Sequence, residues 1–213
     1  SFIEGLYEDQ KQGEKVKVTC TKSNEGFATA GGVQYVACAG NFKDAGLEYT
    51  GALKVLQMIF SYEYLWIQIR VKGGAYGCMC SFSDQGDSMF VTYRDPNLSE
   101  SYKVYDEAAD YVEDFDADDR DMKKYIIGTI GSMDMPMEAV DMGARSFHAY
   151  FLGKTEADLQ KVRDQVLSCT QEDIRALAPI VKAVVEAGNR CCIGNEEKID
   201  QNKEYFDEVK HVL

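Results

Sequence analysis

The stretch EYLWIQIRVKGGAYG, residues 63–77, contains the point at which a helical pattern changes to a strand pattern. Before it, apolar residues recur at three- and four-residue spacing, which predicts one helix of about six turns or two helices with a break near Ser61. After it, GCMCSFS (77–83) and SMFVTYR (88–94) predict two strands joined by a short turn. Gly73-Gly74 is expected to end the helix, with Gly73 as the left-handed cap.

Further strands and helices are predicted on both sides of this junction. Strands are expected at KVKVTCTKS (15–23), VQYVACAGN (33–41) and, as the last strand, RCCIG (190–194). Asn97 or Ser99 is expected to cap the helix that follows the hairpin. Later helices are expected over 119–130, 136–151, 155–168 and 170–187, the last with a possible kink at Pro179. This order predicts an α+β two-layer sandwich, with a mostly antiparallel sheet and helices packed on one face.

Composition narrows the classes of function. The chain has 213 residues, 45% of them hydrophobic, and we expect one domain over residues 1–213. Its formal net charge of −13 disfavours nucleic acid and anionic membranes as partners, and it favours cationic ligands or serves solubility alone. No apolar run approaches the length of a transmembrane helix. Seven cysteines, an odd number, favour a reducing compartment over a disulfide framework.

Metal and nucleotide motifs are weak in this sequence. His148 and His211 are the only histidines and belong to no paired ligand motif, and His148 is expected to be a packed or surface residue and not a metal ligand. The acidic stretch 106–121 lacks the spacing of a calcium loop and is expected to be a solvated helix end and loop. The glycine-rich segments match neither nucleotide-binding fingerprint.

The cysteines are also expected to be structural. Cys78 and Cys80, and the adjacent Cys191 and Cys192, have spacings that suit strands better than a structural zinc site. We therefore expect buried thiols that pack as small apolar groups, and we predict no metal ligand in this chain. A free-standing cysteine–metal protein remains a weaker alternative.

Arg70 and Tyr76 flank the glycine pair and allow two interpretations. In the first, Arg70 offsets the helix dipole and Tyr76 packs at the start of a strand. In the second, the turn brings a guanidinium and a phenol together. Both are hydrogen-bond donors at neutral pH, so the pair could orient a peptide carbonyl and stabilise an oxyanion, but it could not activate a water alone.

Four segments together resemble the last domain of presequence proteases, which are clamshell zinc metallopeptidases of the pitrilysin and insulin-degrading type. The resemblance covers about residues 15 to 194, and its combined motifs are specific. The segments are GGVQYVACAGNFKDAGLEYTGALKVL (31–56), EYLWIQIRVKGGAYG (63–77), TYRDPNLSESYKVYDEAADYV (92–112) and IIGTIGSMDMPMEA (126–139).

The resemblance implies a role for the opening stretch. In that family the N-terminal half binds zinc through an H-x-x-E-H motif, and the C-terminal half supplies an Arg and a Tyr that hold the scissile carbonyl. These two correspond to Arg70 and Tyr76, and we expect Gly73 and Gly74 to lie against the substrate. No H-x-x-E-H occurs in this chain. It therefore resembles a C-terminal fragment of a longer four-domain enzyme, and we expect it to be inactive alone.

The partners implied by the resemblance are the N-terminal half of the same polypeptide, which would hold the zinc, and unfolded peptides as substrates. No nucleic acid or membrane partner is expected. The compartment would be the cytoplasm in a bacterium or an organelle matrix in a eukaryote. The alternative is a non-catalytic peptide-binding or scaffold subunit of a processing-peptidase-like complex.

Overall fold

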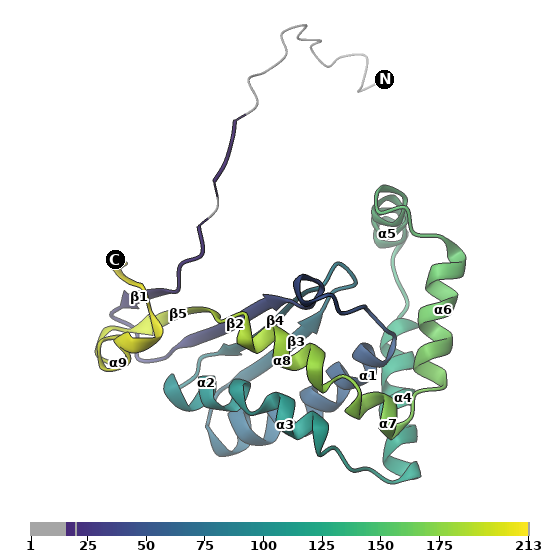
Figure 1. Cartoon of the computed structure of the whole chain (residues 1–213), viewed down its shortest axis with the longest axis horizontal. Coiled ribbons are helices and arrows are strands. Elements are labelled where there is room, and N and C mark those ends of the chain that lie inside the picture. Colours follow the sequence, from purple (N-terminus) through teal and green to yellow (C-terminus); the bar gives the residue numbers. More distant parts are fainter. Residues whose placement is uncertain (1–15, 20, 213) are drawn as a thin grey trace, which may run out of the picture.

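The computed structural model describes residues 16–19 and 21–212, and within this part of the chain six strands form one sheet (Figure 1). The sheet order is β3-β4-β2-β5-β1-β6. Strand β2 is antiparallel to β4 and β5, β3 is antiparallel to β4, and β1 is parallel to β5 and β6. The strands are β1 (Glu25–Thr29), β2 (Tyr35–Asn41), β3 (Gly77–Phe82), β4 (Asp87–Tyr93), β5 (Asn189–Asn195) and β6 (Glu208–His211).

Helices cover one face of this sheet. Figure 1 shows α1, α2, α3 and α8 on that face, whereas α4, α5 and α6, here called the helical arm, extend to one side. The helices are α1 (Ala52–Ile59), α2 (Ser99–Asp106), α3 (Ala108–Glu113), α4 (Asp119–Met133), α5 (Ala139–Phe151), α6 (Glu156–Leu167), α7 (Gln171–Arg175), α8 (Ala178–Glu186) and α9 (Glu196–Gln201). The predicted fold class, a two-layer α+β sandwich with a mostly antiparallel sheet, is confirmed.

Alternating burial explains why the sheet is covered on one face. In β4, Ser88, Phe90 and Thr92 are buried, and the alternate residues Met89 and Tyr93 are exposed on the opposite face. Phe90 packs against Tyr105 of α2 with the two rings tilted and their centroids 5.4 Å apart. The Tyr105 hydroxyl donates a hydrogen bond to the Val36 carbonyl, so this buried polar group is satisfied.

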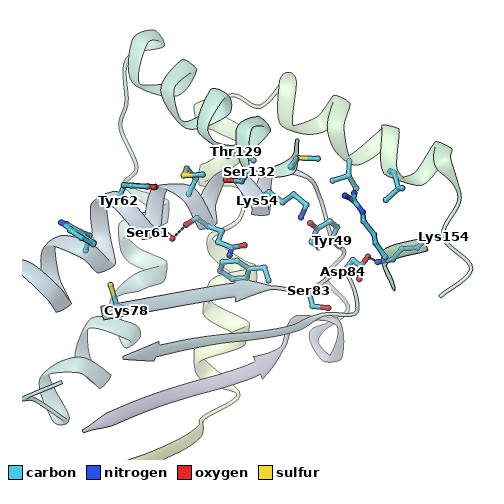
Figure 2. A pocket seen from close by; sticks show the side chains of 18 residues that line it. Tyr49, Lys54, Ser61, Tyr62, Cys78, Ser83, Asp84, Thr129, Ser132 and Lys154 are labelled. Carbon is cyan, nitrogen blue, oxygen red and sulfur yellow. Dashed lines mark hydrogen bonds and ion pairs between the residues drawn. The ribbon is translucent and has the colours of Figure 1, made fainter. Parts of the chain in front are cut away.

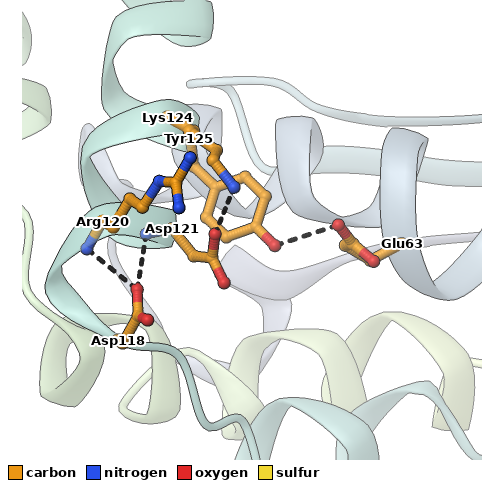
Figure 3. A network of polar contacts seen from close by, with 6 residues as sticks. All are labelled: Glu63, Asp118, Arg120, Asp121, Lys124 and Tyr125. Atoms are coloured by element: carbon orange, nitrogen blue, oxygen red, sulfur yellow. Dashed lines mark hydrogen bonds and ion pairs between the residues drawn. The ribbon is translucent and has the colours of Figure 1, made fainter.

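The start of the helical arm is capped by an aspartate, and one hydrogen bond nearby joins the arm to the body of the domain (Figure 3). The Asp118 side chain caps α4 by accepting hydrogen bonds from the backbone N–H groups of Arg120 and Asp121. One turn later, the Tyr125 hydroxyl donates to a carboxylate oxygen of Glu63 over 3.1 Å. The acidic side chains of the stretch 106–121 are mostly exposed, as predicted, whereas the helix cap that Asp118 provides was not predicted. Among the described residues there is no group of three or more potential metal ligands.

Several predicted boundaries are wrong. In the predicted strand 15–23, the described residues 16–19 and 21–23 form no strand and are mostly exposed, because no neighbouring strand pairs with them; Lys15 and Cys20 lie outside the described residues. Strand β5 is not the last, since β6 follows it. The predicted helix 170–187 is two helices, α7 and α8, with Pro179 in the first turn of α8 rather than at a kink.

Two helix ends also differ from the prediction. Helix α4 continues through Gly131 to Met133, and α5 begins at Ala139 instead of Pro136. Helix α2 has Leu98 at its N-cap and no side-chain cap, so neither Asn97 nor Ser99 caps it. Among the described helices, none is long and apolar enough to cross a bilayer.

Candidate active site

The helix that leads to the candidate site changes its hydrogen bonding halfway along. Helix α1 continues without a break into two π-helical segments, η3 (Phe60–Tyr64) and η4 (Trp66–Lys72). The Ser61 hydroxyl donates to the Gln57 carbonyl near the change, so Ser61 marks a change of winding rather than a break. Insertions of π-helix occur often at functional sites.

The glycine pair closes this helix in a turn that is wider than usual. Gly74 has φ +80° and is the left-handed residue, whereas Gly73 is helical at φ −79°, so the prediction of Gly73 as the left-handed cap is wrong. The N–H of Ala75 donates to the Ile69 carbonyl over 3.1 Å. This bond spans one residue more than the corresponding bond of a Schellman motif, which is consistent with the π-helical winding before it.

The turn brings Arg70 and Tyr76 to the same exposed surface. The Arg70 Cζ lies 5.7 Å from the centroid of the Tyr76 ring and 4.2 Å from the centroid of the Trp66 ring. Tyr76 is 65% exposed, and its ring meets Tyr93 edge to face at 5.8 Å. Among the described residues, the side chains of Arg70 and Tyr76 have no hydrogen-bond acceptor. Two donors therefore point toward solvent from one turn, held in place by aromatic contacts.

Hydrogen bonds behind the turn fix its position. The Asn97 side-chain amide donates to the Gly73 carbonyl over 2.6 Å, and the N–H of Tyr76 donates to the Arg94 carbonyl. Arg94 has φ +50°, an uncommon conformation for a non-glycine residue and one that clusters at functional sites. The predicted cap residue Asn97 thus has a different task, because it ties the chain after the hairpin to the glycine turn.

Asp95 organises the same corner of the molecule. Its buried carboxylate accepts hydrogen bonds from the Ser101 hydroxyl at 2.6 Å and from the N–H of Asn97 at 2.9 Å. Burial raises the pKa of Asp95, although these hydrogen bonds act in the opposite direction. Sequence reasoning missed this role, and the only local signal was the Asp95-Pro96-Asn97 turn at the end of a strand.

The thiols and histidines show no catalytic or metal-binding arrangement in the described part of the chain. Burial raises the pKa of Cys78 to about 11 and that of Cys192 to about 12, so both stay as thiols at neutral pH. Groups of three or more potential metal ligands do not occur among the described residues. His148 is exposed on α5, and His211 lies 3.4 Å from Glu196, so the two histidines share no site.

A cavity of about 870 Å³ lies close to the turn, between β3, the long helix and the helical arm (Figure 2). One part of the cavity is lined by Trp66 and Cys78. The Arg70 guanidinium lies over the Trp66 ring, and Cys78 is two residues after Tyr76. Asp84, at the far end of β3, lines another part. The cavity was not predicted from the sequence.

The comparisons with known proteins agree with this architecture. A structure described as the peptidase M16 inactive domain from Pseudomonas fluorescens superposes with a TM-score of 0.59 over 82% of this chain and 44% of that chain, at 16% sequence identity. The fold is thus that of pitrilysin-type M16 peptidase domains.

Sequence relatives define the family more closely. The model of the PreP C-terminal domain matches residues 24–195, and this chain belongs to that family. It is 43% identical over 192 residues to Protein HypA of Clostridium perfringens, covering 90% of this chain and 20% of that protein. It is 34% identical over 194 residues to Presequence protease 1, chloroplastic/mitochondrial, of Arabidopsis thaliana, covering 89% and 18%. The chain therefore spans about a fifth of the length of these relatives.

Proposed function

We propose that this chain is the domain of a longer zinc metalloendopeptidase that holds the scissile carbonyl of an unfolded peptide and stabilises the transition state. The observation that carries the proposal is the pair of donors on one exposed turn. The Arg70 guanidinium and the Tyr76 phenol lie close together without an acceptor among the described residues. Family membership supports a role in a peptidase.

The chemistry of the pair suits a developing oxyanion. A guanidinium carries a permanent charge and several donors, and a phenol adds one directed donor. Donors that are already oriented stabilise negative charge on the carbonyl oxygen without reorganisation during the reaction. Stacking on Trp66 holds the Arg70 guanidinium, and the edge-to-face contact with Tyr93 holds the Tyr76 ring. Gly73 and Gly74 form the turn that positions these side chains, and the proposal places both glycines against the backbone of the substrate.

The donor set of this chain does not fit a catalytic zinc ion. Such a site needs three nearby protein ligands, and the described His, Cys, Asp and Glu residues form no group of three. The proposal therefore places the zinc ion and the general base in the N-terminal half of the same polypeptide, which is also the main protein partner. It follows that the 213-residue chain alone does not cleave peptides.

The substrate and compartment follow from the same proposal. A formal charge of −13 favours unfolded peptides that carry positive charge. Six cysteines of the described part are free, which suits a reducing compartment. We place the protein in the cytoplasm if its source is bacterial, or in an organelle matrix if it is eukaryotic.

The proposal is tested by a double-mutant cycle in the full-length protein. Arg70→Met and Tyr76→Phe should each lower kcat by about 10²-fold or more, because each removes a donor to the same oxygen. The double variant should lose less than the product of the two losses, since the groups act together. Tyr150→Phe, an exposed tyrosine on α5, is the control and should keep full activity. Unchanged kcat in both single variants would contradict the proposal and favour a scaffold role.

A further inference from the structure

The cavity beside the glycine turn has features that the proposed carbonyl-binding pair does not use. We call it the arm pocket; it is lined by Lys54, Trp66, Phe82, Asp84, Arg145 and Lys154, among others (Figure 2). The arm pocket lies alongside β3, which is an edge strand with β4 as its only neighbour in the described sheet. From Gly77 to Phe82 the strand spans about 17 Å, and Cys78 and Phe82 line the pocket, so it can accommodate several residues of an extended chain.

The arm pocket carries surplus positive charge within a strongly acidic protein. Lys154 pairs with Asp84, which neutralises one of the three cations. Lys54 and Arg145 have no ion-pair partner among the described residues, and the one side-chain hydrogen bond that Arg145 makes there is to the Met137 sulfur at 3.9 Å. Two positive charges therefore remain in a chain whose net charge is −13.

Lys54 is the cation of the arm pocket that a bound anion would stabilise most. It lies half-buried on α1, and burial lowers its pKa; Asp84 partly offsets this effect, whereas Lys154 and Arg145 add to it. A bound anion would remove this penalty by pairing with the ammonium group in a partly desolvated place.

The remaining lining favours an organic anion over a simple ion. Trp66, Phe82 and Leu159 provide apolar surface in the same pocket, as is usual for sites that bind organic ligands. Among the described strands none pairs with the outer edge of β3, so its backbone groups can bind an extended peptide by strand addition. Charge and surface together fit a peptide that carries a carboxylate.

We propose that the arm pocket binds the carboxylate of an extended peptide, with Lys54 and Arg145 as its partners and the peptide lying along β3. The carboxylate is either the C-terminus of the peptide or an Asp or Glu side chain. The inference rests on the proposed role in peptide binding and adds a second contact, remote from the scissile bond. It places an anion-binding contact within a protein whose overall charge attracts cationic peptides.

The single tryptophan of the chain reports directly on this pocket, because Trp66 lines it. The purified chain is titrated with three acetylated octapeptides of Ala, Ser, Val and Leu: the free acid, its C-terminal amide, and the amide with one Ser replaced by Glu. Trp66 emission should change saturably, with at least about tenfold tighter binding for a carboxylate-bearing peptide than for the neutral amide. Tight binding of the free acid alone identifies the C-terminus, and tight binding of the Glu peptide alone identifies a side chain. Equal binding of all three peptides, or no binding, would overturn the inference.

Matched variants show whether the two cations are responsible. Lys54→Met and Arg145→Met should each bring the affinity for the carboxylate peptide close to that of the neutral amide. Arg145 is exposed on α5, so its replacement does not endanger folding. Lys182 lies on the exposed surface of α8, and Lys182→Met makes the same change in net charge. This control variant should have little effect on the affinity for the carboxylate peptide. If Lys182→Met weakens binding as much as Lys54→Met, a general field effect explains the data and the specific site is refuted.

These measurements involve neither zinc nor turnover, so they are independent of the test of the proposed function. If the arm pocket fails to bind carboxylates while Tyr76→Phe still lowers kcat, only the inference falls. If the pocket binds carboxylates and Tyr76→Phe leaves kcat unchanged, the carbonyl-binding role falls instead.

Discussion

Alanine substitution at the two glycines of the turn should destabilise the protein for two different physical reasons. At Gly73 a Cβ atom would lie 2.5 Å from the Ile69 carbonyl oxygen and 3.1 Å from that of Gln68. The backbone must move by about half an ångström to relieve this contact, and overpacking of this kind costs about 1–3 kcal/mol. The same movement strains the 2.6 Å hydrogen bond from Asn97 to the Gly73 carbonyl.

At Gly74 the problem is conformation and not space. The nearest atom to an added Cβ is Pro96 Cγ at 3.6 Å, an ordinary contact, but φ is +80°. A left-handed alanine costs about 1–2 kcal/mol, and the lower entropy of its unfolded chain returns about 0.4–1 kcal/mol. We therefore expect a net loss of about 1 kcal/mol for Gly74→Ala.

Asparagine separates the two causes. It tolerates the left-handed region, so Gly74→Asn should recover part of the loss, whereas Gly73→Asn should be at least as unstable as Gly73→Ala. Urea unfolding of the 213-residue chain measures the free energies, with an unchanged m-value as the check that the unfolded state is comparable. A neutral Gly73→Ala, or a Gly74→Asn variant as unstable as Gly74→Ala, would refute this account of the turn.

Two further predictions concern the support of the turn and the activity of the chain. Asp95→Ala should cost about 2–4 kcal/mol, because it leaves the Ser101 hydroxyl and the Asn97 N–H without their acceptor. Since the folded pKa of Asp95 is raised, its contribution to stability is complete below the unfolded value of about 4 and is lost as pH rises through the folded value. Asp95→Asn keeps one acceptor oxygen and removes the charge, so it should be less destabilising than Asp95→Ala at pH 7, with a flatter pH profile of unfolding; a loss as large as that of Asp95→Ala would contradict this. The purified chain should release no fragments from an unfolded peptide with or without added zinc, as followed by mass spectrometry; zinc-dependent cleavage would contradict the proposed division of the active site.

The local parts of the fold could be predicted from the sequence because their signals are local. The helix before Gly73 and the hairpin after Gly77 have different apolar periodicities, and both are present in the structure. The π-helical winding could not be predicted, since the same apolar spacing is compatible with either backbone hydrogen-bond pattern. Because of this winding, the hydrogen bond from the Ala75 N–H that closes the turn spans one residue more than in a Schellman motif. This shift explains why Gly74, and not Gly73, is left-handed.

Features that depend on distant parts of the chain were missed or misassigned. The alternating residues 16–19 have no strand to pair with, whereas the polar strand β6 forms because β1 offers it an edge. Asn97 is of a residue type that often caps helices, but its side-chain amide donates instead to the carbonyl of Gly73, 24 residues earlier. The cations of the arm pocket are scattered along the sequence, so their proximity depends on tertiary structure alone.

The convergence of Arg70 and Tyr76 was predicted, and the structure places the guanidinium and the phenol ring near each other. Their role in catalysis stays a prediction, because the geometry shows only two available donors. The same holds for Gly73 and Gly74 as residues that contact substrate.

The most direct measurement of the central claim is the single-turnover rate of peptide cleavage by the full-length protein with Tyr76→Phe. The substitution removes one hydroxyl from a side chain that is 65% exposed, so folding should be unaffected. The account predicts a loss of about 10²–10³ in the rate with little change in substrate affinity, because the donor acts mainly on the transition state. A rate within about twofold of the parent would contradict the claim that this turn stabilises the oxyanion.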